Sequence, residues 1–290
     1  MELPRLGLGT QRLTGTDEDK IAACKYAISK GFRHFDSAHA YGTEGIVGQA
    51  IRESGVPREE FWVTTKLWPS DYRTDRIGTA IERRLSALGL DYIDLLYIHH
   101  PYGEFMEAWP YLEQAVKDGK VRFLGISNFE LKPELIDELF ERAEIKPVIM
   151  QVECNPYARR PEVEALIKSF GMAQECWYPL GGPNSRQQGF TSPDMRLNDP
   201  VLKAIGEAHG KSAVQVILRW HLQSGRSAVP GTEGRPDIYW HFDDNINITD
   251  FSLSEDEMRQ INELNKSDFR FFPATYESMQ RIANMDLGDN

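Results

Sequence analysis

Asp36, Tyr41, Lys66 and His99 are the residues whose types and spacing first indicate chemistry. Asp36, Lys66 and His99 each end a short apolar segment, and Tyr41 follows shortly after Asp36. A buried acid and lysine compensate each other's charge. The ammonium would also stabilise a nearby phenolate and lower a pKa that is about 10 in an unperturbed tyrosine. Such a tyrosine could donate a proton near neutral pH, although a purely structural ion pair is the alternative interpretation.

The segments that position these residues are short apolar runs that alternate with longer runs of helical period. The expected strands cover 5–9, 31–36, 61–66, 95–99, 121–125, 148–151, 171–176 and 227–230. Apolar residues at both alternating positions are typical of strands buried on both faces of a parallel sheet. Helix starts are expected at Thr16, which precedes three acidic residues, and at Ser254, which opens a capping box.

Successive strand ends lie about one βα unit apart, roughly 30 residues, except before the last strand, where an extra helix around 213–221 is expected. The pattern predicts an α/β protein that folds as a single (β/α)8 TIM barrel domain over residues 1–290. A doubly wound sheet is the structural alternative. In such a barrel the active site lies at the C-terminal ends of the strands, where the four residues above are expected.

Five sequence blocks at these strand ends resemble one family in composition and order. Residues 35–44 read FDSAHAYGTE, which is similar to the D-[TS]-A-x-x-Y-G signature of the aldo-keto reductases. The later blocks are VTTKLW at 63–68, YIHHP at 97–101, GISNF at 125–129 and MQVECNP at 150–156. Five ordered blocks are far more specific than any one of them. The resemblance extends from Pro4 to the C-terminal tail.

This resemblance, to the bacterial-type aldehyde and carbonyl reductases of the family, implies an enzyme that passes hydride from a nicotinamide to a carbonyl. It implies that Tyr41 is the proton donor and that Lys66 and Asp36 are the pair that tunes it. It also implies that His99 orients the carbonyl oxygen. The expected product of an aldehyde or small ketone is the alcohol.

The resemblance also assigns a cofactor site. Ser127, Asn128 and Gln151 are similar to the residues that bind the nicotinamide carboxamide, which needs both a donor and an acceptor. Trp177 stands where the family has a stacking tyrosine, and an indole also offers a π face. The expected cofactor-binding set is completed by Leu180, Thr232, Arg235, His241 and Asn245.

The cofactor-selecting stretch after the last strand departs from the family pattern. A glycine replaces the lysine that often binds the 2′-phosphate of NADPH, and His241 falls at the position of the arginine. Bidentate guanidinium contact is the stronger way to hold a phosphate, and Arg235 supplies it only if it folds back. We expect NADPH on the basis of the family, with NADH a close second.

The expected substrate pocket includes Trp68, His100 and Trp109, and the tail 265–290 is expected to pack near it. Adjacent strand residues point to opposite faces, so His99 and His100 are not expected to face the same side. This argues against a two-histidine metal site, and no metal is expected. The family's usual N-terminal hairpin, which plugs the bottom of the barrel, is expected to be absent because the first strand begins almost at Met1.

Composition excludes several other classes of protein. The 290 residues include 33 basic and 44 acidic side chains, for a net charge of -11, so nucleic acid is not expected as a partner. We expect no transmembrane helix, since no apolar run is long enough to span a membrane, and no signal peptide. Three scattered cysteines predict reduced thiols in a cytoplasmic protein, without a disulfide framework or a zinc site. The expected partner is a small carbonyl substrate, and the expected assembly is a monomer or a weak homodimer.

Two rival functions remain open at this stage. The first is a cofactor-binding regulatory or scaffold subunit with little turnover, against which the presence of all four catalytic residues counts. The second is a metal-dependent barrel hydrolase that uses Asp36 and His99, although the chain shows no clustered His and Asp ligands of the kind such sites need.

Overall fold

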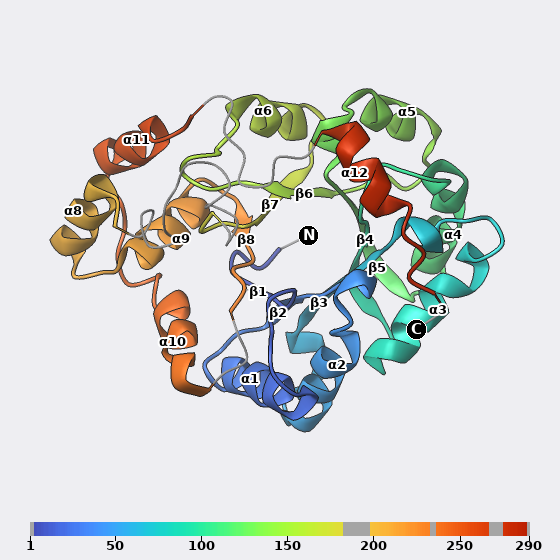
Figure 1. Ribbon diagram of the computed structural model, residues 1–290, viewed down its shortest axis with the longest axis horizontal. Coiled ribbons are helices and arrows are strands. Elements are labelled where there is room, and N and C mark those ends of the chain that lie inside the picture. Colours follow the sequence, from blue (N-terminus) through green and yellow to red (C-terminus); the bar gives the residue numbers. More distant parts are fainter. Residues whose placement is uncertain (1–2, 182–197, 233–235, 267–274, 289–290) are drawn as a thin grey trace.

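The computed structural model describes residues 3–181, 198–232, 236–266 and 275–288. Its centre is one sheet of eight parallel strands that follow one another in chain order (Figure 1). The strands are β1 (Leu8–Gly9), β2 (His34–Asp36), β3 (Trp62–Leu67), β4 (Ile93–Ile98), β5 (Val121–Ser127), β6 (Ile149–Glu153), β7 (Ala173–Trp177) and β8 (Ser227–Ala228). Strands β3 to β6 are buried along most of their length, as expected when both faces of a sheet are covered.

The sheet closes on itself. Leu6 bridges Ala228 and Gly9 bridges Gly231, both in the parallel sense. The backbone nitrogen of Gly7 donates to the oxygen of Ala228 at 2.9 Å, and the nitrogen of Gly9 donates to the oxygen of Pro230 at 3.0 Å. The predicted (β/α)8 barrel is therefore confirmed, and the doubly wound sheet is excluded because it would leave two open edges.

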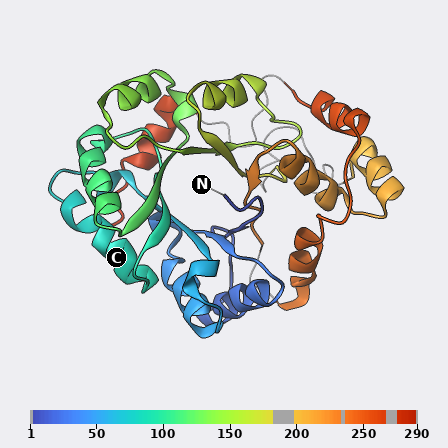
Figure 2. The ribbon, with the colours of Figure 1, turned by 180° about the vertical axis from the view of Figure 1, so that it is seen from behind.

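Helices surround the barrel (Figures 1 and 2). They are α1 (Asp17–Ser29), α2 (Glu44–Glu53), α3 (Ile77–Leu88), α4 (Phe105–Lys117), α5 (Glu134–Arg142), α6 (Pro161–Ser169), α8 (Pro200–His209), α9 (Ala213–Gln223), α10 (Trp240–Ile246), α11 (Glu255–Glu263) and α12 (Tyr276–Ala283). Thr16 and Ser254 begin α1 and α11 with complete capping boxes, as predicted. In the described residues, none of the helices has the length and apolar character needed to cross a membrane.

Both ends of the barrel are covered by chain termini. Figure 1 shows the N-terminal end near the centre of the ring, and Leu3 packs there with Trp62, Leu95, Tyr97 and Ile149. At the opposite end, the tail is tied to the segments that follow β3 and β4.

Several hydrogen bonds hold the tail in place and reach the segments that follow β3 and β4. The Trp68 indole nitrogen donates to the Met285 carbonyl at 2.9 Å, and the Tyr276 hydroxyl donates to the Pro101 carbonyl at 3.1 Å. The tail therefore lies over the C-terminal ends of these strands, where a barrel of this kind carries its active site.

Candidate active site

The C-terminal ends of β2, β3 and β4 bring the four expected catalytic residues together. The Lys66 ammonium donates to Asp36 Oδ1 at 2.6 Å and to the Ser37 carbonyl at 2.9 Å. Both side chains of this ion pair are buried. A short 3-10 turn, His39–Tyr41, carries Tyr41, and Gly42 ends the turn at a φ of 63°, a conformation that glycine adopts without strain.

Tyr41 lies between the ammonium and a histidine ring. Lys66 Nζ is 4.8 Å from the centre of the Tyr41 ring, and the His99 ring meets it edge-on at a centroid distance of 5.6 Å. Burial raises the pKa of Tyr41 to about 12, while the positive charge of Lys66 acts in the opposite direction. The expectation of a net lowered pKa is therefore wrong for the protein without its cofactor, because desolvation of the phenolate outweighs the attraction of the ammonium.

Lys66 itself remains charged. Burial is the largest single influence and acts against the ammonium, but the charge and hydrogen bond of Asp36 together with Tyr41 and Glu175 outweigh it and hold the pKa of Lys66 above its ordinary value. A buried lysine with a partner carboxylate at 2.6 Å therefore places a fixed positive charge beside the phenol.

His99 and His100 face the same side, contrary to the prediction that neighbouring side chains of a strand point to opposite faces. Their rings stack at a centroid distance of 4.6 Å and an angle of 6°, and both line the same cavity. The reason is that β4 ends at Ile98. Beyond it, the backbone nitrogens of both histidines donate to the hydroxyl of Tyr72, at 2.7 and 3.3 Å, so the chain is no longer extended.

Both histidines are neutral at physiological pH. Burial lowers the pKa of His99 well below its ordinary value and lowers that of His100 to about 3, and the charge of Lys66 adds to both effects. The Nδ1 atom of His99 is buried and has no hydrogen-bond partner among the residues that the structure describes. In stacked rings the nitrogen lone pairs lie in parallel planes and do not converge on one point, so the pair remains unsuited to hold a metal ion.

A cavity of about 410 Å³ opens over these residues. Its walls are formed by Gln11, Ala40, Tyr41, Trp68, His99, His100, Ser127, Asn128, Glu130, Leu131, Gln151, Glu153, Arg160, Trp177, Tyr178, Met279, Met285 and Leu287. The set includes the three expected nicotinamide ligands, the expected stacking residue, and two of the three expected pocket residues. Three apolar side chains come from the tail.

Amide groups fill the side of the cavity formed by β5, β6 and β7. Asn128 takes a left-handed conformation directly after β5, with a φ of 64°. Its Nδ2 donates to the His99 carbonyl at 3.1 Å, and its Oδ1 accepts from the Trp177 indole at 3.1 Å. Gln151 Nε2 donates to Asp36 Oδ1 at 3.1 Å. Since Gln151 Nε2 gives its two hydrogens to Asp36 and Glu175, Gln151 offers its carbonyl oxygen to a ligand, and the Ser127 hydroxyl, which accepts from Asn128 Nδ2 at 3.1 Å, offers its own hydrogen. A carboxamide needs one acceptor and one donor of this kind, so the residues present fit a nicotinamide.

Sequence reasoning missed a buried carboxylate below this site. Glu175 in β7 accepts from Gln151 Nε2 at 2.5 Å and from the Tyr97 hydroxyl at 3.0 Å, and burial raises its pKa. Glu175 thereby fixes the amide of Gln151 from below. The sequence did offer a signal: Glu175 and Trp177 are two residues apart in one strand, so their side chains point to the same face of the sheet.

A second missed group is an ion pair in the cavity wall. Arg160 Nη1 lies 3.0 Å from Glu130 Oε1, and both side chains are buried. Glu130 Oε2 is buried, and within the described part of the chain it has no hydrogen-bond partner. The two residues are far apart in the chain and belong to different loops, so no local spacing indicated their contact.

The remaining predicted residues lie elsewhere. Thr232 Oγ1 is 3.4 Å from His241 Nδ1, and Asn245 is buried one turn further along α10. Leu180 packs on a core cluster that α8 and α9 share. Arg235 lies outside the described residues.

Trp109 is not in the pocket. Its indole nitrogen donates to the Ile145 carbonyl at 3.1 Å, and its ring belongs to the main hydrophobic core. The helical spacing of Trp109 with Phe105 and Leu112 turns it toward the barrel wall rather than toward the cavity. The prediction of a pocket role for Trp109 is contradicted by the structure.

The closed (β/α)8 barrel thus brings a tyrosine, a lysine paired with a carboxylate and a neutral histidine together beside one amide-lined cavity, an arrangement that suits an oxidoreductase of the nicotinamide-dependent class. The model of the Aldo/keto reductase family matches residues 5–266, and the chain belongs to this family. Its members named below are reductases and a dehydrogenase, in agreement with an NAD(P)H-dependent enzyme.

Several relatives match almost the whole chain. The 9,11-endoperoxide prostaglandin H2 reductase of Trypanosoma cruzi is 41% identical over 267 residues, which cover 92% of this chain and 89% of that protein. The glyoxal reductase of Bacillus subtilis is 38% identical and covers 92% and 91%, and the morphine 6-dehydrogenase of Pseudomonas putida is 38% identical and covers 91% and 88%. A crystal structure of a Bombyx mori aldo-keto reductase in complex with NADP superimposes with a TM-score of 0.84 at 31% identity, covering 96% of this chain and 93% of that one.

Proposed function

We propose that this enzyme reduces aldehydes and small ketones to alcohols, with NADPH as its hydride donor and Tyr41 as its general acid. The observation that carries the proposal is the position of Tyr41 in the cavity wall, 4.8 Å from the buried ammonium of Lys66 and edge-on to His99. The cofactor supplies the hydride when bound. The remaining task, delivery of a proton to the carbonyl oxygen, falls to the protein.

Tyr41 is suited to that task because it holds its proton. A pKa of about 12 keeps its hydroxyl protonated near neutral pH, so the acid form is present, but it also makes the phenol a weak acid, since general acid catalysis is most efficient when the pKa lies near the working pH. When the proton leaves, the Lys66 ammonium faces the phenolate that remains, and Asp36 holds the ammonium in place. A positive charge fixed before the reaction stabilises the developing anion without reorganisation.

His99 completes the arrangement as a neutral donor. Because its pKa lies well below the ordinary value, one ring nitrogen carries a proton and the other does not. We propose that the protonated nitrogen binds the carbonyl oxygen and directs it toward the Tyr41 hydroxyl. A neutral imidazole suits this role because it orients the oxygen without competing as the proton source.

The cofactor site is proposed to combine Ser127, Asn128 and Gln151 at the carboxamide with Trp177 at the ring face. At the other end, Thr232 Oγ1 lies 3.4 Å from His241 Nδ1, and we propose that this hydroxyl and imidazole contact the cofactor where the family selects between NADPH and NADH. A complex with NADP in the Bombyx mori relative supports NADPH as the first choice. NADH remains the second, because an imidazole is a weaker phosphate ligand than a guanidinium.

The substrate class follows from the side chains opposite the amides. Trp68, Met279, Met285 and Leu287 give this wall an apolar character, which suits aldehydes and small ketones. The Bacillus subtilis relative is named a glyoxal reductase, in agreement with a small aldehyde substrate.

A panel of aldehydes and ketones tests the proposal. Turnover is followed by consumption of NADPH or NADH, each with and without a chelator. We expect reduction with a higher kcat/KM for NADPH and no effect of the chelator. Tight cofactor binding without turnover would favour a regulatory subunit, and chelator-sensitive hydrolysis without a cofactor would favour the metal-dependent hydrolase.

A further inference from the structure

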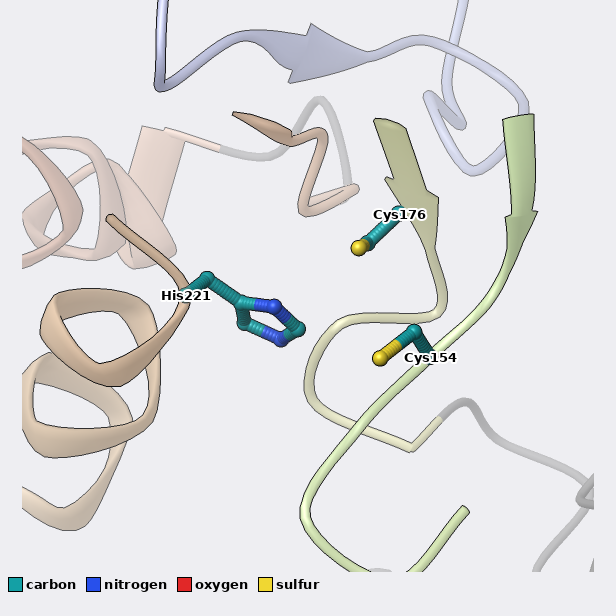
Figure 3. Close-up of side chains that lie close together, drawn as sticks. All are labelled: Cys154, Cys176 and His221. Atoms are coloured by element: carbon teal, nitrogen blue, oxygen red, sulfur yellow. The ribbon is translucent and has the colours of Figure 1, made fainter. Parts of the chain in front are cut away.

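Two cysteines and a histidine that are far apart in the sequence gather outside the barrel. Cys154 follows β6, Cys176 lies in β7, and His221 lies in α9, and Figure 3 shows the three side chains converging. The two sulfur atoms and a ring nitrogen of His221 all lie within 4.8 Å of one another, and all three residues are buried. None of the three lines the reductase cavity.

The hydrogen bonds of His221 define which ring nitrogen carries its proton. Nε2 lies 3.2 Å from the carbonyl oxygen of Pro179, and a carbonyl oxygen only accepts, so Nε2 carries the proton. Nδ1 therefore presents a lone pair. A histidine whose second nitrogen donates to a backbone carbonyl is oriented as metal-binding histidines are. Burial lowers the pKa of His221 well below its ordinary value, so the ring is in the neutral form that binds metals.

The thiols have the charge environment that a thiolate requires. Hydrogen bonding with Cys176 lowers the pKa of Cys154 to about 7, and the charges of Arg226 and Arg160 assist while burial opposes. Burial and the same hydrogen bond raise the pKa of Cys176, and in the structure the Cys154 thiol donates to the Arg159 carbonyl at 3.7 Å. A divalent cation would displace the thiol protons, because thiolates are the form that binds metals.

The neighbouring charges balance when such a cation is bound. Two thiolates neutralise a divalent ion, and Arg226 is paired with Glu164, to which its Nη1 lies at 3.3 Å and which Arg159 and Lys168 also contact. Arg226 Nε donates to His221 Nδ1 at 3.4 Å, a long contact and the hydrogen bond that a metal ion would replace. The ion and its two thiolates would then carry no net charge, which lowers the cost of burying the ion.

We propose that Cys154, Cys176 and His221 form a binding site for a thiophilic d10 cation, with Zn²⁺ as the representative ion. Two thiolates and one imidazole are a soft donor set that favours Zn²⁺ over Mg²⁺ or Ca²⁺. Three protein ligands leave one position of a tetrahedral ion open. The bound ion would join α9 to β6 and β7, on the outer side of the strand end that carries Trp177.

Cd²⁺ provides the direct test, because thiolate–cadmium bonds give an ultraviolet charge-transfer absorption. Titration of the reduced wild-type protein is expected to give this absorption, saturating at about one equivalent, and Zn²⁺ is expected to displace it. Cys154→Ala and Cys176→Ala are each expected to weaken Cd²⁺ binding at least about tenfold, and His221→Gln similarly. Because the site is buried, each addition is followed until the absorbance is constant.

Cys24→Ala is the matched control. Cys24 is a buried thiol in α1, far from this cluster, and burial raises its pKa to about 12. Its removal is expected to leave the titration unchanged. The proposal is overturned if wild-type protein shows no thiolate absorption, if the absorption survives loss of Cys154 and Cys176, or if it disappears with Cys24 alone.

A second measurement covers the case in which a cysteine variant does not fold. Zn²⁺ is expected to raise the Tm of wild-type and Cys24→Ala protein, since a ligand that binds the native state stabilises it. An unchanged Tm at saturating Zn²⁺ would overturn the proposal without any variant at the site. Neither measurement uses NADPH or a carbonyl, so the outcome is independent of the proposed reductase activity.

Discussion

Replacement of Tyr41 by phenylalanine removes the proposed proton donor and keeps the ring. The ring contacts with Lys66 and His99, at 4.8 and 5.6 Å, involve its face and edge and survive the change. A positioned general acid contributes about 10²- to 10⁴-fold to a rate. The barrier should therefore rise by about 3 to 5 kcal/mol, at 1.36 kcal/mol for each tenfold. The Kd for NADPH should not change, because Tyr41 is not among the expected cofactor ligands.

The assay combines steady-state reduction of a good aldehyde substrate with a fluorescence titration of NADPH. Tyr92→Phe is the control, since Tyr92 precedes β4 at the opposite end of the barrel and stacks under Arg58 at 3.9 Å. It should reduce the aldehyde as the wild type does. A loss of less than about tenfold in Tyr41→Phe would refute the role of Tyr41 as general acid.

The pH profile tests the electrostatic part of the same argument. Because the pKa of Tyr41 is raised to about 12, its hydroxyl stays protonated through the neutral range. Ionisation of Tyr41 should therefore not lower kcat/KM between about pH 6 and pH 9. If the charge of Lys66 outweighed burial, the phenol would ionise earlier and the rate would fall at the alkaline end. A fall in kcat/KM at the alkaline end that is present in the wild type and absent in Tyr41→Phe would refute the argument that burial determines the pKa of Tyr41.

Three further changes test other parts of the structure. Lys66→Met leaves the buried carboxylate of Asp36 without its cation and should lower the free energy of unfolding by about 3 to 5 kcal/mol. Urea denaturation measures this change, and an unchanged midpoint would show that the ion pair is not buried in solution. Trp177→Ala removes the proposed stacking surface and should raise the Kd for both NADPH and NADH by about tenfold. An effect on only one of the two cofactors would show that Trp177 does not stack on the nicotinamide, which both share. His241→Ala should lower the ratio of NADPH to NADH efficiency, whereas an unchanged ratio would separate His241 from the 2′-phosphate.

The order of strands and helices could be predicted from the sequence because its signals are local. Capping boxes at Thr16 and Ser254 are complete within four residues, and strand ends are marked by polar residues after apolar runs. The residues that follow β2 and β3 were placed correctly at one end of the barrel because parallel strands all point the same way. Errors arose where a strand ended earlier than the alternation assumed, as at His100.

The sequence by itself therefore determined the family, the barrel and the types of residue at the strand ends, since each depends on patterns only a few residues long. Only the tertiary structure decided which distant groups meet. The stacking of His99 on His100 depends on the hydroxyl of Tyr72, the orientation of Gln151 depends on Glu175, and the burial of Trp109 depends on the packing of α4. The pKa of Tyr41 also required the structure, because desolvation depends on every atom that surrounds the phenol and no spacing in the chain encodes it.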